Sequence, residues 1–485
     1  MVQSRITNLL EEHSHRQGSK TAWIQPETGK QLSYQEAFHA VKRTASRIRK
    51  IKTGSDGRIG LAMEKGIPFT IALLGIIRSG HIAIPLPVQW SEREQNNAVT
   101  HCAIKTIITD SEHENPIRNL QTVDTVVSMD PPKHNQTIFL DRLNTGPERL
   151  DSQTSDALWL FTSGTTGDPK PVRLTHKNLL AHTRISNEWF HLTADDLWMI
   201  PLPFHHMGGL GALFRTLYAG ASLVIPPASH TGLRQSIKAY PATFLSMVPT
   251  QFRRLIDDPS STVPDSLRVL LVGGDRIPPK LARQSITRGW PVHGSYGTTE
   301  TCSHIAIAPP DQYQLNPKMP KATVLPEVNI TIEKQEIIVE GPMVSPGYQN
   351  LTIGTGPRFS DDGFHTGDAG KMTENGKLIV EGRLDQRIIT GGETVVPGEI
   401  EDVLEEHSAV HEAVVVGISD QKWGQSVSTY VELQTEGTIS REELAEHSRN
   451  QLADYKIPKH WKFGSIPRTA SGKPDRQTIK NILDS

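Results

Sequence analysis

Hydroxyl residues, glycines and a lysine crowd the stretch LFTSGTTGDPKPVRLTH, residues 160–176. Glycine allows positive φ, so that backbone N–H groups can converge on one point, and the hydroxyl groups and the lysine add donors and a positive charge. Such a concave, donor-rich loop suits phosphate oxygens. An ordinary surface turn is the alternative. The loop is not a P-loop, because the pattern GxxxxGK[ST] is absent.

Four later motifs carry residue types that could act on the same ligand. They are SYGTTET (295–301), FHTGDAG (364–370), GRLDQRIITGGETVVPGEIE (382–401) and PRTASGKPDR (467–476). Tyr296 offers a stacking face and Glu300 a hard oxygen ligand, while Asp368 follows a Thr-Gly turn and could accept hydrogen bonds from vicinal hydroxyls. Each motif alone could also be turn chemistry or a solvated charge.

Short apolar runs alternate with stretches of helical length. The runs lie at 58–63, 106–110, 125–130, 158–161, 222–226, 242–248 and 269–272. Most are continuous rather than alternating, as expected of strands buried on both faces of a parallel sheet. The intervening stretches, such as Tyr34–Lys50 and Lys177–Trp189, therefore predict α/β layering. One strand is expected to end at Gly273–Gly274, and Pro278–Pro279 suits the first turn of the next helix.

The texture changes after about residue 324. VNITIEKQEIIVEGP predicts two antiparallel strands with a tight polar turn. Beyond GRLDQR, the segment Glu399–His407 has one apolar face, and the runs 413–418 and 428–433 are typical of strands. Ser440 and Glu443 predict a capping box that opens another helix. The last hundred residues are numerous enough for a domain of their own.

Composition narrows the class of protein. The formal net charge of −2 provides no basic excess for a phosphate backbone, so we expect no nucleic-acid partner. Two distant cysteines, Cys102 and Cys302, form no disulfide framework and favour a reducing compartment. The apolar segment Phe69–Ile77 is too short to span a membrane, and the charged first residues do not resemble a signal peptide. We expect a cytoplasmic protein without membrane insertion, and a homo-oligomer stays open.

The ordered set TSGTTGxPK, YGxTE, TGD, GRxD, PxEIE and P-R-T-x-[ST]-GK resembles the acyl-adenylate-forming superfamily over almost the whole chain. The resemblance implies an α/β fold. Residues 1–384 would form an N-terminal AMP-binding domain of two α/β subdomains and a small β-barrel, and residues 385–485 a small mobile α+β C-terminal domain. It also implies an AMP-forming acid–thiol ligase that uses ATP, Mg²⁺ and CoA. A carboxylate attacks the α-phosphate of ATP, and a thiol then displaces AMP from the acyl-AMP.

The resemblance also assigns roles. The loop that holds the phosphates of ATP would consist of Thr162, Ser163, Gly164, Thr165, Thr166 and Lys170. The residues that contact the adenine and the ribose would be Tyr296, Gly297, Asp368 and Arg383. The catalytic residues would be Lys473, Thr299 and Glu300. Glu300 would bind Mg²⁺. Lys473 would stabilise charge that grows on the carboxylate and α-phosphate oxygens. Asp385 would be the hinge about which the C-terminal domain rotates between the two steps.

The acyl pocket is harder to predict. SYGTTETCSHI, SDQKWGQ and GGETVVPGEIE resemble most closely the o-succinylbenzoate–CoA ligases of menaquinone biosynthesis. The pocket would then contain His206, Arg215, Gly274, Thr298 and Ser303. That acid has a spectator carboxylate, which needs a donor in a partly dry pocket, and we expect Arg215 to supply it. The alternatives are an arginine on a helix surface and a histidine satisfied within a loop.

Three departures and three other functions accompany this reading. Pro171 stands where relatives usually have glycine and removes one N–H donor, and Gln386 replaces a second acidic residue. The section before EGPMVSPGY is short, which predicts a trimmed barrel. A ligase for another aromatic or medium-chain acid stays open, as does a carrier-loading adenylation domain. An inactive adenylate-binding module is the alternative from a different class; intact Lys473, Glu300 and Asp368 disfavour it.

Overall fold

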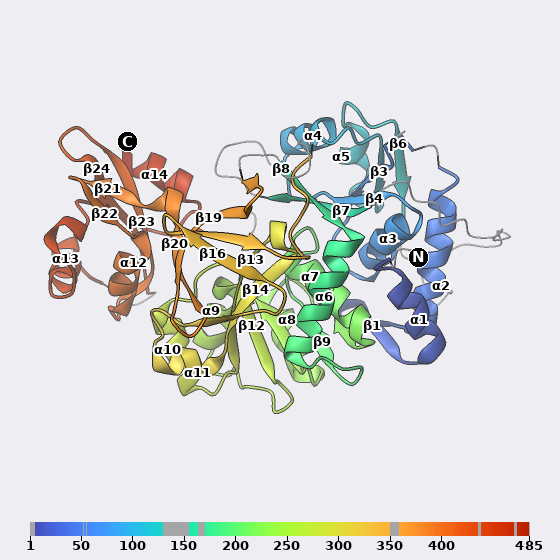
Figure 1. Cartoon of the computed structure of the whole chain (residues 1–485), viewed down its shortest axis with the longest axis horizontal. Coiled ribbons are helices and arrows are strands. Elements are labelled where there is room, and N and C mark those ends of the chain that lie inside the picture. The colour runs from blue at the N-terminus through green and yellow to red at the C-terminus, as the bar shows by residue number, and fades with distance from the viewer. Residues whose placement is uncertain are drawn as a thin grey trace.

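Three sheets, each flanked by helices, build the protein in the computed structural model (Figure 1). The structure describes residues 5–51, 53–54, 56–129, 155–162, 170–349, 358–434, 438–469 and 473–484. The helices are α1 (Asn8–Arg16), α2 (Tyr34–Ile48), α3 (Ile67–Arg78), α4 (Glu92–His101), α5 (Glu114–Arg118), α6 (His176–Phe190), α7 (Met207–Ala219), α8 (His230–Ala239), α9 (Pro249–Asp257), α10 (Pro279–Thr287), α11 (Pro310–Leu315), α12 (Pro397–Glu406), α13 (Arg441–Arg449) and α14 (Arg476–Asp484). Short 3₁₀ turns are η1 (Pro26–Thr28), η2 (Thr299–Thr301), η3 (Leu384–Gln386) and η4 (Asp454–Lys456).

The first sheet is parallel except at one edge. Its order is β6 (Thr125–Ser128), β5 (Thr106–Thr109), β3 (Arg58–Ala62), β4 (Ile82–Pro85), β7 (Asp156–Thr162) and β8 (Lys170–Thr175), and only β8 runs antiparallel to its neighbour. The apolar runs at 58–63, 106–110, 125–130 and 158–161 form β3, β5, β6 and β7, as predicted. The apolar segment Phe69–Ile77 lies in helix α3, whose residues are buried on nearly every side. Its position in the protein interior explains its apolar composition.

The second sheet joins a parallel half to an antiparallel half. The parallel strands are β1 (Thr21–Gln25), β10 (Ser222–Val224), β9 (Leu197–Met199), β11 (Phe244–Met247), β12 (Val269–Gly273) and β13 (Val292–Thr298), with β2 (Lys30–Ser33) antiparallel at the edge. From β13 the sheet continues through β14 (Ser303–Ala308), β15 (Ala322–Val324), β20 (Lys377–Arg383), β19 (Gly363–Met372), β17 (Glu336–Glu340) and β16 (Asn329–Glu333), while β18 (Phe359–Ser360) pairs with β19. The barrel that the resemblance implies stays a prediction; the described strands of that section extend the second sheet.

The third sheet belongs to the C-terminal part, which lies at the left of Figure 1. Its order is β22 (Glu393–Val395), β21 (Ile388–Thr390), β24 (Gly424–Leu433) and β23 (Val410–Asp420), and β25 (His460–Phe463) pairs with β24. The predicted capping box at Ser440 is confirmed: the Ser440 hydroxyl accepts from the backbone of Glu443, whose carboxylate accepts from Ser440. The domain boundary at residue 385 stays a prediction.

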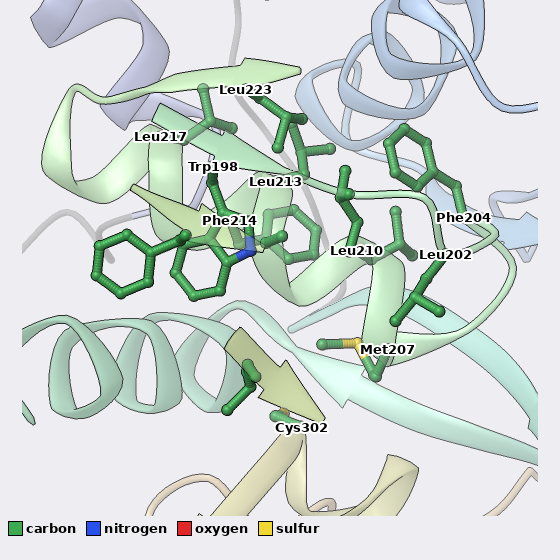
Figure 2. Packing of buried hydrophobic residues seen from close by; sticks show 14 of the residues in the cluster. Trp198, Leu202, Phe204, Met207, Leu210, Leu213, Phe214, Leu217, Leu223 and Cys302 are labelled. Atoms are coloured by element: carbon green, nitrogen blue, oxygen red, sulfur yellow. The ribbon is translucent and has the colours of Figure 1, made fainter. Parts of the chain in front are cut away.

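Helix α7 fixes the wall that carries the predicted acyl-pocket histidine. Figure 2 shows its Leu210, Leu213 and Leu217 among buried side chains that include Trp198. The first turn approaches the preceding loop so closely that a Cβ atom at Gly209 would lie 2.2 Å from the carbonyl oxygen of Pro203. Only glycine allows that approach. The contact places the helix directly against the PLPFHH segment, whose Phe204 is buried in the core.

The described part of the chain includes both cysteines. Cys102 and Cys302 are both free and buried there. None of the described helices combines the length and apolar composition that crossing a bilayer requires.

Candidate active site

The described ends of the glycine-rich loop are the last and first residues of two paired strands. Thr162 at the end of β7 faces Lys170 at the start of β8, and the Thr162 hydroxyl donates to the Lys170 carbonyl over 3.4 Å. The loop is therefore the connection of a β-hairpin, with the exposed Lys170 at its base. Ser163, Gly164, Thr165 and Thr166 lie outside the described residues.

The residues predicted to hold the nucleoside lie together, although they come from three strands. They are Tyr296 on β13, Asp368 on β19 and Arg383 on β20. The Tyr296 hydroxyl donates to Oδ2 of Asp368 over 2.9 Å, and Nη1 of Arg383 lies 3.2 Å from Oδ1. Burial raises the pKa of Asp368, although the positive charge of Arg383 opposes the shift. The expected Thr-Gly turn is wrong: Asp368 lies within β19, where Gly367 at φ +71° kinks the strand.

A second arginine joins this group. Arg358 donates to the carbonyl oxygen of Thr366 over 3.2 Å, and its charge acts to lower the pKa of Asp368. Arg358 was not predicted from the sequence, because no motif surrounds it. Its position beside Gly367 depends on the pairing of β18 with β19, which sequence spacing does not reveal.

The predicted hinge residue, Asp385, forms hydrogen bonds with one of the residues predicted to bind the ribose. Asp385 lies in η3, where its Oδ2 accepts from Nη2 of Arg383 over 2.9 Å and its Oδ1 accepts from Nε over 3.1 Å. Burial works to raise the pKa of Asp385, but the hydrogen bonds and charge of Arg383 outweigh it and lower that pKa. One guanidinium therefore bridges Asp368 and Asp385.

Glu300 is a buried carboxylate on η2, beside Thr299. Its side chain is 5% exposed, and Oε1 accepts from the Tyr348 hydroxyl over 2.7 Å. Among the described residues there is no cluster of three or more His, Cys, Asp or Glu side chains that could hold a metal ion alone. Mg²⁺ is commonly bound by one or two carboxylates together with substrate phosphates, so a single hard carboxylate fits that cation.

The hairpin of β13 and β14 carries both Tyr296 and Glu300 and fixes the distance between them. In β13 and β14, Gly297 pairs with His304 and Thr298 with Ser303, and a Cβ atom at Gly297 would lie 1.9 Å from the Ser303 carbonyl oxygen. The Thr298 hydroxyl is buried without a hydrogen-bond partner among the described residues. Strand β13 extends through Thr298, and its pairing with β14 shifts register between Tyr296 and Gly297.

Lys473 reaches the large domain from the C-terminal part. Its Cε lies 4.0 Å from the position that a Cβ atom would occupy at Gly274. Burial, with a smaller contribution from the charge of Lys473, lowers the pKa of His206 to about 4. Burial and then the charge of His206 lower the pKa of His205 to about 3, and the two rings lie 4.5 Å apart. Both imidazoles are therefore neutral at pH 7, beside the lysine ammonium.

Ion pairs hold the two parts in this orientation. Nη1 of Arg276 lies 2.6 Å from Oδ1 of Asp402, and Nη2 of Arg253 lies 2.8 Å from Oε2 of Glu405. Asp402 and Glu405 are buried on α12, while the arginines come from α9 and from the loop before α10. A cleft between the two parts is lined by Val248, Arg253, Arg276, Lys473 and Arg476 among others.

Arg215 is buried in α7, so the alternative of an arginine on a helix surface is wrong. It is 1% exposed, and its guanidinium lies 4.6 Å from the ring of Trp198. The group folds back along the helix, because its Nη1 would be 2.9 Å from a Cβ atom at Gly211, one turn closer to His206. Burial lowers its pKa to about 9. Nε and Nη1 have no hydrogen-bond partner among the described residues.

Comparison with known proteins agrees with this arrangement. The family model described as AMP-binding enzyme matches residues 10–349, and the model of the AMP-binding enzyme C-terminal domain matches residues 399–473. A 2-succinylbenzoate–CoA ligase of Bacillus licheniformis is 32% identical over 491 residues, which cover 97% of this chain and 99% of that protein.

Solved structures are similar over the whole chain. The o-succinylbenzoate CoA synthetase of Bacillus subtilis, in complex with its acyl-adenylate intermediate, has a TM-score of 0.85 and 28% identity, with 98% of each chain covered. The same enzyme with ATP and a magnesium ion has a TM-score of 0.84 and 27% identity, with 99% of each chain covered. With both of its parts matched by family models, this chain belongs to the AMP-binding enzyme family.

Proposed function

We propose that this chain is an AMP-forming 2-succinylbenzoate–CoA ligase. The acid's carboxylate would attack the α-phosphate of ATP to give acyl-AMP and pyrophosphate, and the thiol of CoA would then displace AMP. The observation that carries the proposal is the position of Lys473, which extends from the C-terminal part to Gly274 and His206. A lysine ammonium held there by a closed interface can stabilise charge that develops on the oxygens of an acyl-phosphate.

The nucleoside side of the proposal rests on the Asp368 group. Asp368 already accepts from Tyr296 and Arg383, and a carboxylate so fixed is suited to accept from ribose hydroxyls. Its partners restrict its rotation, so that little ordering remains to be done when a ligand binds. Arg383 would keep this group connected to the hinge at Asp385 while the C-terminal domain moves.

The phosphate side rests on Lys170, the loop that it follows, and Glu300. When bound, Mg²⁺ would supply Lewis-acid stabilisation of phosphate oxygens. Glu300 would hold the cation, and Thr299 beside it would approach the α-phosphate. The similar Bacillus subtilis enzyme was solved with ATP and a magnesium ion, which supports magnesium as the cation.

The choice of acid rests on relatives and on Arg215. The Bacillus licheniformis and Bacillus subtilis enzymes described above are named as ligases of 2-succinylbenzoate, an acid that keeps a second carboxylate after activation. A charged guanidinium that is fully buried is costly unless an anion compensates it. Arg215 has no acidic partner within ion-pair distance among the described residues, and it lies within α7, the helix that starts after His206. We propose that it compensates the spectator carboxylate, with Thr298 and Ser303 as hydroxyl donors and Gly274 at the pocket floor.

A panel of acids tests the proposal. Purified protein would receive ATP, Mg²⁺ and CoA with 2-succinylbenzoate, benzoate, a medium-chain fatty acid or a dicarboxylic acid, and pyrophosphate release would be followed. Turnover strongest with 2-succinylbenzoate supports the assignment. Preference for another acid would keep the reaction and replace the substrate, whereas AMP binding without turnover on any acid would indicate an adenylate-binding module. We further propose that the protein is cytoplasmic and has no nucleic-acid partner, because its two cysteines favour a reducing compartment and its net charge of −2 provides no basic excess.

A further inference from the structure

The hydroxyl of Tyr348 and the carboxylate of Glu300 form a buried contact that no motif assigns. They lie 2.7 Å apart, the tyrosine is 6% exposed and the glutamate 5%. Among the described side chains, Tyr348 is the one that donates to this carboxylate. The ring of Tyr348 packs edge-on against Phe359, with centroids 5.5 Å apart, so the hydroxyl cannot swing away freely.

The main chain of the same segment holds the other end of Glu300. The backbone N–H of Ser345 donates to the Glu300 carbonyl oxygen over 2.7 Å. Residues 345–348 therefore contact both the backbone and the side chain of one glutamate. Without these contacts the Glu300 carboxylate could rotate about its last torsion, which is broad for glutamate.

This segment is also attached to the strand that leaves the phosphate loop. The Ser345 hydroxyl donates to the carbonyl of Arg173 over 2.7 Å, and Arg173 donates from its backbone to Gly347 over 3.0 Å. Tyr348 forms a bridge with Val172. Since β8 starts at Lys170, the segment 345–348 sets the distance between the base of the phosphate loop and Glu300.

We propose that Tyr348 is a positioning residue that fixes the orientation of the Glu300 carboxylate for Mg²⁺. The hydroxyl holds Oε1 and leaves Oε2 for the cation. Mg²⁺ requires near-ideal octahedral geometry, so a carboxylate fixed in advance binds it more tightly than a rotating one. The inference rests on the proposed function only in taking Glu300 as the metal ligand.

The variant Tyr348→Phe removes one hydroxyl and keeps the ring packed on Phe359. The test measures Mn²⁺ affinity by electron paramagnetic resonance, with the non-hydrolysable α,β-methylene analogue of ATP bound. Loss of a group that orients a metal ligand typically weakens metal affinity tenfold or more, so we expect a decrease of about tenfold. Affinity for the analogue without metal should stay unchanged. In pyrophosphate release, the Mg²⁺ concentration for half-maximal rate should rise, while the rate at saturating Mg²⁺ is largely recovered.

Two controls separate positioning from stability. Tyr34→Phe removes another buried hydroxyl, one that donates to the Ala221 carbonyl over 2.7 Å far from the site, and should leave Mn²⁺ affinity unchanged. In the background of Glu300→Gln, Tyr348→Phe should have no further effect on Mn²⁺ affinity. Unchanged Mn²⁺ affinity in Tyr348→Phe, with tight binding in the wild type, overturns this inference alone. If wild-type protein binds the analogue equally well with and without Mn²⁺, the metal role of Glu300 in the proposed function fails as well.

Discussion

The Cε atom of Lys473 lies 4.0 Å from the point where a Cβ atom would stand at Gly274, although the two residues belong to different parts of the chain. Gly274 follows the last strand residue of β12, at the carboxyl edge of the parallel half-sheet, where α/β proteins commonly bind ligands. The lysine therefore lies at the carboxyl edge of this sheet, where the adenylation step is proposed to take place.

Replacing Lys473 by alanine should separate the two half-reactions. Adenylation should fall by about 100-fold or more, because a group that stabilises transition-state charge is removed. Thioester formation from supplied acyl-AMP should change little, since the lysine is expected to leave the site before that step. Pyrophosphate release and CoA-thioester formation measure the two steps. Equal losses in both would contradict the assigned role.

Charge reversal at the interface should affect the same step. Arg276→Glu places two acidic groups together where Arg276 now pairs with the buried Asp402. Unpairing a buried charge is costly, so the closed orientation should lose population and adenylation should slow more than thioester formation. The double variant Arg276→Glu with Asp402→Arg should recover much of the rate.

The matched control reverses a charge in an exposed pair. Arg449 and Glu446 lie on α13 with side chains that are 53% and 68% exposed, so Arg449→Glu should leave both steps unchanged. No recovery in the Arg276/Asp402 double variant, with correct folding, would show that this pair does not set the orientation.

The lowered pKa of His206 predicts a pH dependence of stability. Its pKa is about 4 in the folded protein, against an ordinary value near 6.5, so below pH 6.5 the unfolded chain binds a proton that the folded chain does not. The free energy of unfolding should therefore fall as pH decreases from 6.5 to about 4, by up to ~1.4 kcal/mol per pH unit for this group. Urea unfolding of His206→Gln should show a smaller slope. Identical slopes in both proteins would contradict the shift.

Substitution of Gly297 by alanine should disrupt the nucleoside site. A Cβ atom there would lie 1.9 Å from the backbone oxygen of Ser303, which cannot move without breaking the β13–β14 pairing. AMP affinity, measured by calorimetry, should fall at least tenfold because Tyr296 and Glu300 are displaced. Gly54→Ala, which would meet only the flexible Lys105 side chain at 3.3 Å, is the control. Unchanged AMP binding in Gly297→Ala would show that the hairpin does not position the site.

The proposed role of Arg215 predicts a change that depends on the substrate. Arg215→Met keeps volume over Trp198 and removes the charge. KM for 2-succinylbenzoate should rise tenfold or more, because the spectator carboxylate loses its compensating cation. KM for an aromatic acid with one carboxylate should rise little or fall. Parallel changes for both acids would assign Arg215 to packing.

Local sequence patterns predicted much of the fold. Continuous apolar runs gave buried parallel strands because both faces of those sheets are covered, and VNITIEKQEIIVEGP folds into β16 and β17 around a turn at Lys334 and Gln335, both with positive φ. The helix after Pro278 starts as expected, at Pro279. These features depend on residues close in sequence.

The contacts that complete the site were not predictable in the same way. Tyr348 reaches Glu300 through a bridge between β8 and a loop far along the chain, and no periodicity encodes that pairing. The burial of Arg215 is against the usual preference of arginine for water, so sequence alone left both of its readings open. Asp368 lies inside a strand because Gly367 kinks it without ending it, which a Thr-Gly pair does not distinguish from a turn.

The nucleotide product of the complete reaction is the most direct test. With 2-succinylbenzoate, CoA, Mg²⁺ and ATP, chromatography of the products should show AMP and pyrophosphate in amounts equal to the thioester formed. Formation of ADP and phosphate in place of AMP would contradict the account at its centre, because ATP would then be cleaved at a bond that the proposed chemistry leaves intact.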